Sequence, residues 1–363
     1  MSAPRVTLKD IASKLGVSHA TVSLALKNHP RISKERRDEV HALAEKMGYQ
    51  PDPMLSSLVA YRHSKRSIPI HSAIAWINHW DKPDALRQLH EFDLYWQGAS
   101  KAVERFGYRL EEFVWKKEMT ARRMETILNT RQIRGVLIPP HQYQPDWGDF
   151  HWQDFSVIRF GLSIKNIASH IVTSDQMQGV SLAAKTIHDY GYERIGFAVS
   201  NQFDKHLGGN HLAGYQAAQR IVPFQHVIPP LLLPINPYQP KQAAAMLEKW
   251  ITKYKPDAIL TTDPLVPAML HDLGMRIPED VAVASTSLSD ILSIDAGLDQ
   301  NSEEIGRVAV ETVISLINAN DSSRPFIPRR ILVASTWRDG KCLPRKNPTP
   351  EAPGDETLVA SEA

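Results

Sequence analysis

Residues 6–27, VTLKDIASKLGVSHATVSLALK, decide how the amino-terminal part of this 363-residue chain folds. Thr7 opens a capping box, in which a hydroxyl and an acid three residues later satisfy free backbone donors. Apolar residues then follow helical spacing as far as Gly16, which ends the run. Ser18 can cap a second helix, predicted over residues 19–27.

A third helix is expected directly afterwards. Ser33 is its predicted cap, and apolar residues at helical spacing continue to Met47, before Gly48. Two short helices joined by a tight turn, with a third packed on them, have the plan of a helix-turn-helix unit. Spacing alone leaves a generic small helical bundle as an open alternative.

The order of residues in this region resembles the DNA-binding head of the lactose-repressor (LacI/GalR-type) family of transcriptional regulators. The resemblance runs without gaps over about fifty residues and rests on Val6-Thr7-Leu8-Lys9-Asp10-Ile11-Ala12, Gly16-Val17-Ser18, Thr21-Val22-Ser23, Ile32-Ser33, Arg37, Val40 and Gly48-Tyr49-Gln50-Pro51. It implies a sequence-specific regulator, usually a repressor, that binds DNA as a homodimer.

The resemblance also assigns roles to individual residues. The positions that would read bases in the major groove are His19, Ala20 and Leu24. Residues suited to phosphate contacts, several of which could equally be helix caps, are Thr7, Ser18, Thr21, Ser23, Ser33 and Arg37. The family often has arginine where this chain has Leu24, so we expect a different operator base at that position, contacted through apolar atoms.

Residues 52–67 match the family's hinge helix and linker. Asp52 followed by Pro53 is a favourable helix start, although a helix this short is marginal on its own. The resemblance places Leu58 where the family wedges a leucine into the minor groove, with Leu55 beside it. Leu58 sealing the hinge against the body is the alternative, and Leu55 is bulkier than the family's usual alanine.

Charge and cysteine content limit the classes of protein that fit. The first 66 residues carry twelve Lys/Arg and six Asp/Glu, whereas the whole chain has a formal charge of only +2. A basic head on an acidic body favours a polyanionic partner. The single cysteine excludes an intrachain disulfide framework. With no long apolar run and no apolar leader, we expect a cytoplasmic protein that is not held in a membrane.

From residue 68 onward, short apolar runs alternate with amphipathic stretches. The predicted strands are Ala73–Ile77, Gly135–Ile138, Ser156–Phe160, Arg194–Ala198, Ala258–Thr261 and Val281–Ser285, and the predicted helices are Leu94–Phe106, Ala121–Thr130, Gln178–Tyr190, Gly214–Ile221 and Gln242–Tyr254. This alternation predicts parallel sheets with helices on both faces.

The resemblance to the family continues more thinly through this body, for example at Gly191-Tyr192-Glu193-Arg194 and at Gln300 with Glu304-Ile305-Gly306. It implies the α/β class: an all-α helix-turn-helix head with a hinge helix, then a two-lobed periplasmic-binding-protein-like core of doubly wound parallel sheets. The expected domains are the head at 1–51, the hinge at 52–67, an effector-binding and dimerisation core at 68–343, and a disordered tail at 344–363.

Ligands of open α/β sheets bind beyond the carboxyl ends of the strands. The candidate effector contacts on the loops there are Trp76, Asn78, Trp80, Asp204, Thr262, Asp263 and Ser287. Trp76 and Trp80 could stack on a ring-shaped ligand or pack inside the lobe. The loop that holds His141 and His151 lacks the ligand spacing of a metal site, so neither a metal nor a cofactor is expected.

Two departures from the family bear on the effector. The family's effector-contacting arginine aligns near Gly209 or Asn210, and its Gly-Phe-Asp reads Ser285-Thr286-Ser287 here. A carbohydrate therefore remains only one candidate for the small-molecule effector.

The sequence favours a homodimeric repressor that binds a palindromic DNA operator under control of a small molecule in the inter-lobe cleft. An activator of the same architecture is the first alternative, and a small-molecule-binding protein without specific DNA binding is the second. We find none of the Gly-x-Ser-x-Gly, Walker, His-Glu-x-x-His or dinucleotide motifs, so an enzyme is not expected.

Overall fold

The computed structural model describes residues 8–26, 32–47, 49, 72–234, 240–288, 293–319 and 327–346. Thr7 and the hinge residues Leu55 and Leu58 lie outside these ranges, so their predicted roles are not addressed by the structure.

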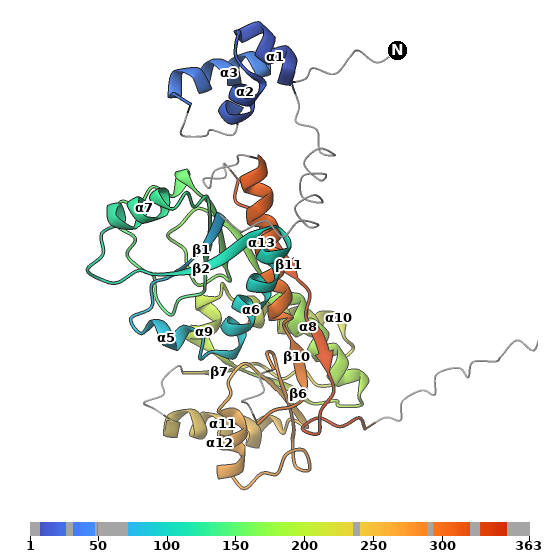
Figure 1. The fold of residues 1–363 in the computed structure, drawn as a ribbon. Coiled ribbons are helices and arrows are strands. Elements are labelled where there is room, and N and C mark those ends of the chain that lie inside the picture. The colour runs from blue at the N-terminus through green and yellow to red at the C-terminus, as the bar shows by residue number, and fades with distance from the viewer. Residues whose placement is uncertain are drawn as a thin grey trace, which may run out of the picture.

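The head contains the three predicted helices, α1 (Leu8–Leu15), α2 (His19–Leu26) and α3 (Lys34–Lys46) (Figure 1). Each helix contributes two side chains to one small buried cluster, made of Ile11, Ala12, Val22, Ala25, Val40 and Ala44. Gly16 adopts a φ of 63° in the turn between α1 and α2, a conformation that favours glycine. The spacing of apolar residues therefore predicted both the helices and the sides that they bury.

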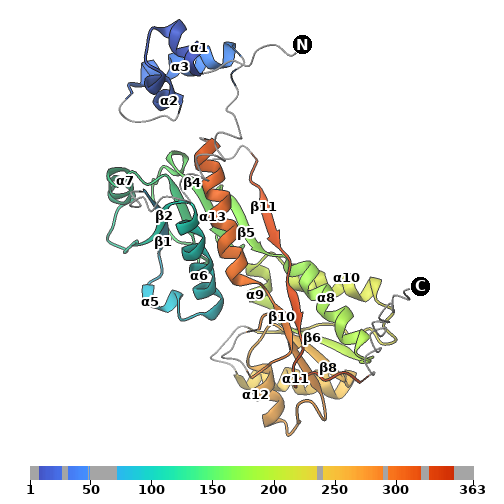
Figure 2. The ribbon, with the colours of Figure 1, turned by 45° about the vertical axis from the view of Figure 1, so that its right-hand side comes forward.

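The body consists of two lobes, each built on a six-stranded sheet (Figure 2). The sheet of the first lobe is parallel, in the order β11-β5-β4-β3-β1-β2: β1 (Ser72–Asn78), β2 (Tyr108–Val114), β3 (Gly135–Ile138), β4 (Ser156–Phe160), β5 (His170–Ser174) and β11 (Arg330–Val333). Its helices are α5 (Pro83–Leu86), α6 (His90–Arg105), α7 (Ala121–Thr130), α13 (Ser302–Ala319) and the short 3-10 helix η1 (Trp152–Asp154).

The sheet of the second lobe has the order β12-β10-β9-β8-β6-β7, and only the pairing of β12 with β10 is antiparallel. Its strands are β6 (Ile195–Ser200), β7 (Leu231–Leu233), β8 (Ala258–Thr261), β9 (Ala282–Ser285), β10 (Gly297–Asp299) and β12 (Thr336–Arg338). Its helices are α8 (Gln176–Asp189), α9 (Asn201–His206), α10 (Asn210–Ile221), α11 (Pro240–Tyr254) and α12 (Val266–Asp272).

The expected α/β fold class, with helices on both faces of parallel-rich sheets, is confirmed. In β1, successive side chains enter opposite clusters: Ile74 and Trp76 pack under α6 and α13, whereas Ala75 and Ile77 pack under α7. A strand covered on both faces reads as a continuous apolar run, which is why β1 could be predicted. Strand β2, with the sequence YRLEEFV, lies at a partly exposed sheet edge and gave no such signal.

The chain crosses between the lobes three times, after β5, after β10 and after β11 (Figure 2). Two side chains tie these crossings together. The Ser174 hydroxyl donates a 2.9 Å hydrogen bond to Gln300, and the Asn301 amide donates one of 2.8 Å to the carbonyl of Ala334. The crossings therefore form a single braced hinge.

Residues 344–346, at the start of the predicted tail, lie against the second lobe. The Tyr192 hydroxyl donates to the Pro344 carbonyl at 2.7 Å, and the Lys346 ammonium group lies 2.8 Å from the Asp257 carboxylate. These contacts hold residues 344–346 on the second lobe, because aromatic and acidic groups there are available as partners.

Helices α6 and α13 approach each other so closely that only glycine fits at their crossing. A Cβ atom at Gly98 would overlap the carbonyl oxygen of Glu303, and one at Gly306 would overlap that of Tyr95. Backbone contact of this kind fixes the position of α6 against α13 within the first lobe.

We predict that Gly306→Ala lowers the free energy of unfolding of the core by about 1–3 kcal/mol, because overpacking outweighs the better helix propensity of alanine. Urea unfolding followed by tryptophan fluorescence measures this. The control is Glu104→Ala on the exposed side of α6, for which a change within about 0.5 kcal/mol is expected. Equal stability of Gly306→Ala and the unmodified chain would contradict the close crossing.

Candidate DNA-binding head and effector cleft

The amino-terminal end of α2 is capped and exposed. The Ser18 hydroxyl oxygen accepts a hydrogen bond from the Thr21 backbone N–H at 3.0 Å, and the two hydroxyl oxygens lie 2.8 Å apart. This is the N-cap that the sequence predicted, and it orients the first turn of the helix.

The three predicted base-reading residues lie away from the head's core. His19 and Ala20 are exposed and Leu24 is half-buried, whereas Val22 and Ala25 on the other side of α2 are buried. Positions four apart share a helix face, so Ala20 and Leu24 belong to one outward surface with His19 at its leading end. The arrangement has the geometry that a major-groove recognition helix needs.

The predicted phosphate contacts are distributed around this helix. Ser33 caps α3 by accepting from the Arg36 N–H at 3.4 Å, and it is exposed. Ser23 and Arg37 are half-buried. Capping and phosphate binding are compatible, because a helix amino terminus attracts anions. The structure thus leaves these roles as predictions.

In the first lobe, Trp76 is fully buried instead of lining an open surface. Its ring meets Trp96 edge-on at 5.4 Å and lies 5.3 Å from Phe160. Its indole nitrogen has no hydrogen-bond partner. Of the two roles left open by the sequence, packing inside the lobe is the one that this geometry shows.

Asn78 and Trp80 support the loop after β1. The Asn78 amide donates to the carbonyl of Pro83 and to Glu112, both at 3.0 Å, and its oxygen accepts from the Trp80 N–H. The Trp80 indole donates to the Pro140 carbonyl at 2.9 Å. Their polar groups are therefore engaged within the lobe.

Three predicted effector residues of the second lobe brace its loops in the same way. Asp204 is buried and accepts from the backbone N–H groups of His211 and Leu212. Burial raises the pKa of Asp204, but the hydrogen bond and charge of His211 outweigh it, so the pKa is lowered. The Thr262 hydroxyl oxygen accepts from the Ser200 N–H, and Asp263 accepts from the Leu265 N–H at 2.9 Å.

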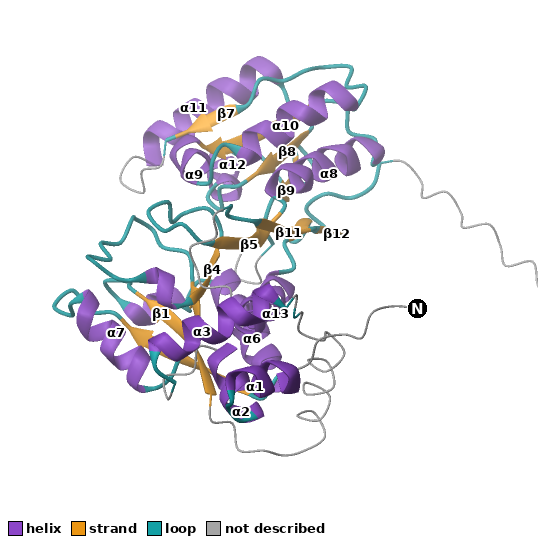
Figure 3. Cartoon of the chain, turned by 90° about the horizontal axis from the view of Figure 1, so that it is seen from above, coloured by secondary structure: helices purple, strands orange, loops and turns teal. Residues whose placement is uncertain are grey.

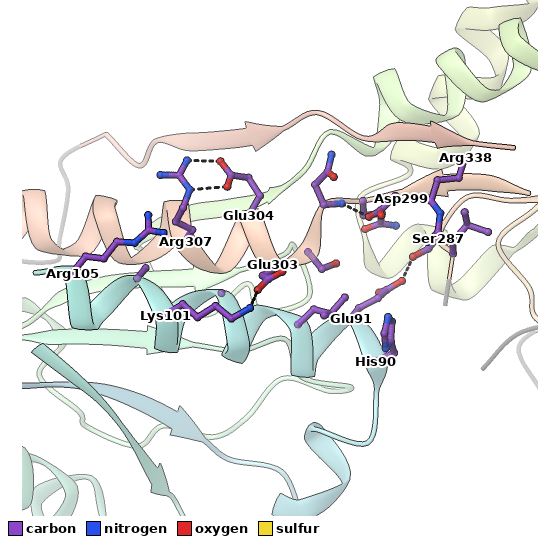
Figure 4. A pocket seen from close by; sticks show the side chains of 17 residues that line it. His90, Glu91, Lys101, Arg105, Ser287, Asp299, Glu303, Glu304, Arg307 and Arg338 are labelled. Carbon is purple, nitrogen blue, oxygen red and sulfur yellow. Dashed lines mark hydrogen bonds and ion pairs between the residues drawn. The ribbon is translucent and has the colours of Figure 1, made fainter. Parts of the chain in front are cut away.

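Ser287 is the predicted effector residue that reaches across to the other lobe. Its hydroxyl donates a hydrogen bond to the carboxylate of Glu91, in the first turn of α6 (Figure 4). Glu91 was not identified from the sequence, because a lone acid on an amphipathic helix carries no motif. Burial raises the pKa of Glu91 to about 7.

This pair lies at the edge of a hollow of about 560 Å³ between α6, the start of α13 and the hinge crossings (Figure 4). Charged and imidazole groups dominate its walls: His90, Glu91, Lys101, Arg105, Asp299, Glu303, Glu304, Arg307 and Arg338. Several of them pair with one another, including Lys101 with Glu303 and Arg307 with Glu304. The hollow is suited to a small polar molecule.

The aromatic loop of the first lobe is a packed structure. His141 is buried, its Nδ1 lies 2.8 Å from the Pro139 carbonyl oxygen, and its Nε2 accepts from the His79 N–H. Burial lowers the pKa of His141 to about 4, so the ring is neutral at physiological pH. Within the described ranges, no group of three or more His, Cys, Asp or Glu side chains is placed to hold a metal ion.

Comparison with known proteins agrees with this division into head and body. Residues 7–52 match the family described as bacterial regulatory proteins, lacI family, and residues 184–339 match a periplasmic binding protein-like domain. The chain carries a lacI-family head on a periplasmic-binding-protein-like core.

Among curated relatives, the transcriptional regulator MalR of Streptococcus pneumoniae is 24% identical over 339 residues, covering 90% of this chain and 97% of MalR. The ribose operon repressor of Bacillus subtilis is 25% identical over 289 residues, covering 76% of this chain and 80% of the repressor.

Among solved structures, a complex of the transcriptional regulator CelR with cellobiose has a TM-score of 0.57 at 18% identity, covering 93% of this chain and all of CelR. The lac repressor dimer bound to its operator and an anti-inducer has a TM-score of 0.53 at 16% identity, covering 94% of this chain and all of the repressor chain. These likenesses concern the fold. Over the described residues, no helix is both long and apolar enough to span a membrane.

We predict that Ser18→Ala weakens the lacI-family head by about 1 kcal/mol, because the first turn of α2 loses its cap. Hydrogen exchange of the α2 amides in the full chain should accelerate about fivefold. Ser23→Ala, which removes a hydroxyl from the same helix, is the control and should leave these rates nearly unchanged. Equal rates in both variants would show that the cap contributes nothing to α2.

Proposed function

We propose that this chain is a sequence-specific DNA-binding transcriptional regulator, a homodimeric repressor that binds a palindromic operator under control of a small molecule. The observation that carries the proposal is the capped and exposed α2 within a region that matches the lacI family over residues 7–52. Relatives named as transcriptional regulators and operon repressors support it. As a partner of cellular DNA it would act in the cytoplasm.

In this proposal the head divides its contacts between reading and positioning. His19, Ala20 and Leu24 contact base edges in the major groove. The phosphate contacts, which fix register without reading sequence, come from Thr7, Ser18, Thr21, Ser23, Ser33 and Arg37. Leu55 and Leu58 of the hinge enter the minor groove.

The effector acts at the inter-lobe region. The similar CelR structure holds cellobiose, which supports a carbohydrate as one candidate ligand. Of the predicted contacts, Ser287 faces the opposite lobe directly. Asn78, Trp80, Asp204, Thr262 and Asp263 brace the surrounding loops, and Trp76 packs inside the first lobe. A ligand that prefers one arrangement of the lobes would shift the dimer toward or away from the geometry that binds DNA.

Selection of random and genomic DNA fragments by the purified chain, followed by sequencing, tests the function. The expected result is enrichment of one two-fold symmetric sequence. The position of enriched sites relative to promoters then separates a repressor from an activator. No enriched sequence, either alone or with a metabolite extract, would contradict specific DNA binding.

We predict that Leu24→Arg changes the preferred base at one symmetric pair of operator positions, because arginine can bond guanine in a bidentate manner and leucine cannot. The same selection measures it. Ser13→Arg, on an exposed position of α1, is the control: it adds the same charge but should leave the preferred sequence unaltered. An identical motif for Leu24→Arg would mean that this side chain faces away from the bases.

A further inference from the structure

The contact between Glu91 and Ser287 joins the two lobes on the cleft side of the hinge braces, in the same hollow as Gln300 and Asn301. Glu91 lies in the first turn of α6 in the first lobe, and Ser287 lies in the loop after β9 in the second. The residues are 196 positions apart in the sequence, so the lobe arrangement alone brings them together.

Both partners are held in place by their own lobes. The Ser287 N–H donates to the Ser285 hydroxyl oxygen at 3.1 Å, and that hydroxyl donates back to the Ser287 carbonyl at 2.7 Å. The neighbouring Thr286 N–H donates to the Thr261 carbonyl at 2.9 Å, and the Thr286 carbonyl accepts from the Gln300 amide at 3.3 Å. On the other side, the glycine crossing with α13 fixes α6. Neither partner can shift without moving the lobe that carries it.

Within the part of the chain that the structure describes, the carboxyl group of Glu91 has no compensating cation. Among the described residues, Ser287 is its hydrogen-bond partner, and no lysine, arginine or histidine lies within ion-pair distance of it. A half-buried carboxylate in this position depends on the single hydroxyl from the opposite lobe. If the lobes separate, water replaces that hydroxyl, so the contact and the closed arrangement exist together.

We propose that Glu91 and Ser287 form an inter-lobe latch that holds the core closed, and that a polar effector acts on this regulator by competing for the latch. The role of the latch in controlling DNA binding rests on the function proposed above, but its effect on the lobes does not. This chain has serine where the family's Gly-Phe-Asp places a carboxylate, and the latch carboxylate comes from the first lobe instead.

Other contacts across the cleft are weaker. His206 Nε2 lies 3.4 Å from the carbonyl oxygen of His141, and a Cβ atom at Gly208 would only just touch Leu162 at 4.0 Å. These contacts place the lobes near each other at a second point, but neither is a hydrogen bond between two side chains. The latch is therefore the stronger constraint on opening.

The experiment measures the distance between the lobes in the full chain without DNA. Spin labels are attached at Arg122→Cys on α7 and Glu248→Cys on α11, both exposed, in a Cys342→Ser background. Labelled chains are diluted with unlabelled protein, so that distances within one chain dominate. The unmodified chain should give one main distance.

At pH 6, Glu91→Ala and Ser287→Ala should each raise the ratio of open to closed molecules about three- to tenfold, since the hydrogen bond between the lobes is lost. The double variant should open no further than the single variants, because both remove the same contact. Asp93→Asn is the matched control, since Asp93 also lies on α6 but bonds Arg87 and Gln97 within its own lobe. Thermal unfolding confirms that each variant is folded.

An unchanged distance distribution in both single variants would overturn the latch, and so would strictly additive opening in the double variant. Because no DNA is present, failure here leaves the proposed function standing. Conversely, if the DNA selection enriched no sequence, the distance measurement would still test the latch.

The latch should also respond to pH. Burial raises the pKa of Glu91 to about 7 in the closed core, whereas an exposed glutamate titrates near 4.5, so closing takes up a proton. The closed arrangement is therefore most favourable below about pH 4.5, where Glu91 is protonated in both states. Its advantage over the open arrangement is lost as the pH rises from there through 7. Between pH 6 and pH 8, the ratio of open to closed molecules should rise about tenfold.

Other titratable groups around the latch are His90 and Tyr95 on α6, Asp299 on β10, Glu303 on α13 and Arg338 on β12. Glu91→Gln retains all of them and removes only the ionisation of residue 91. The distance distribution of Glu91→Gln should be nearly constant from pH 6 to pH 8. The same pH response in this variant as in the unmodified chain would assign the response to another group, His90 above all, and exclude Glu91 as its source.

Discussion

The arrangement of the body depends on the bracing of three backbone crossings. Ser174 bonds Gln300, and Asn301 bonds the Ala334 carbonyl, so that each crossing is tied to a neighbour by one side chain. Three parallel connections allow the lobes to rotate about a common axis but oppose sliding and twisting. A hinge of this kind converts a small change in the cleft into a rigid-body movement.

The first lobe is also coupled to the hinge through a close helix contact. Backbone contact between α6 and α13 at Gly98 and Gly306 joins the start of α6 to the helix that directly follows the second crossing. Glu91 stands at that start, so a ligand at the latch acts on an element already coupled to the hinge. The carboxylate, the helix pair and the crossings thus form one continuous set of contacts.

Much of the fold could be predicted from the sequence, because several helices and strands are marked by a residue pattern within one short stretch of the chain. The capping serine at Ser18 and the apolar spacing around Val22 defined the head, and central strands such as β1 read as unbroken apolar runs. Edge strand β2 mixes charged and apolar residues, so its apolar residues show no clear alternation. Helix α13 carries many buried residues along its length, so its apolar residues show no clear helical spacing.

The sites were predictable to different degrees for a related reason. The outward surface of α2, which is predicted to read bases, follows from helical geometry within one short segment. The effector cleft is assembled from segments almost 200 residues apart, so the sequence identified loops such as those of Asn78 and Asp263 but could not show that their polar groups are already engaged. Glu91 became visible only when the opposite lobe placed Ser287 against it.

The central claim is that the position of the lobes and the binding of DNA are linked. It is tested most directly by measuring the inter-lobe distance distribution in one sample with and without a saturating amount of the selected operator DNA. The account predicts that DNA changes the ratio of open to closed molecules, because a linkage between two equilibria is reciprocal. An identical distribution with DNA fully bound would contradict it.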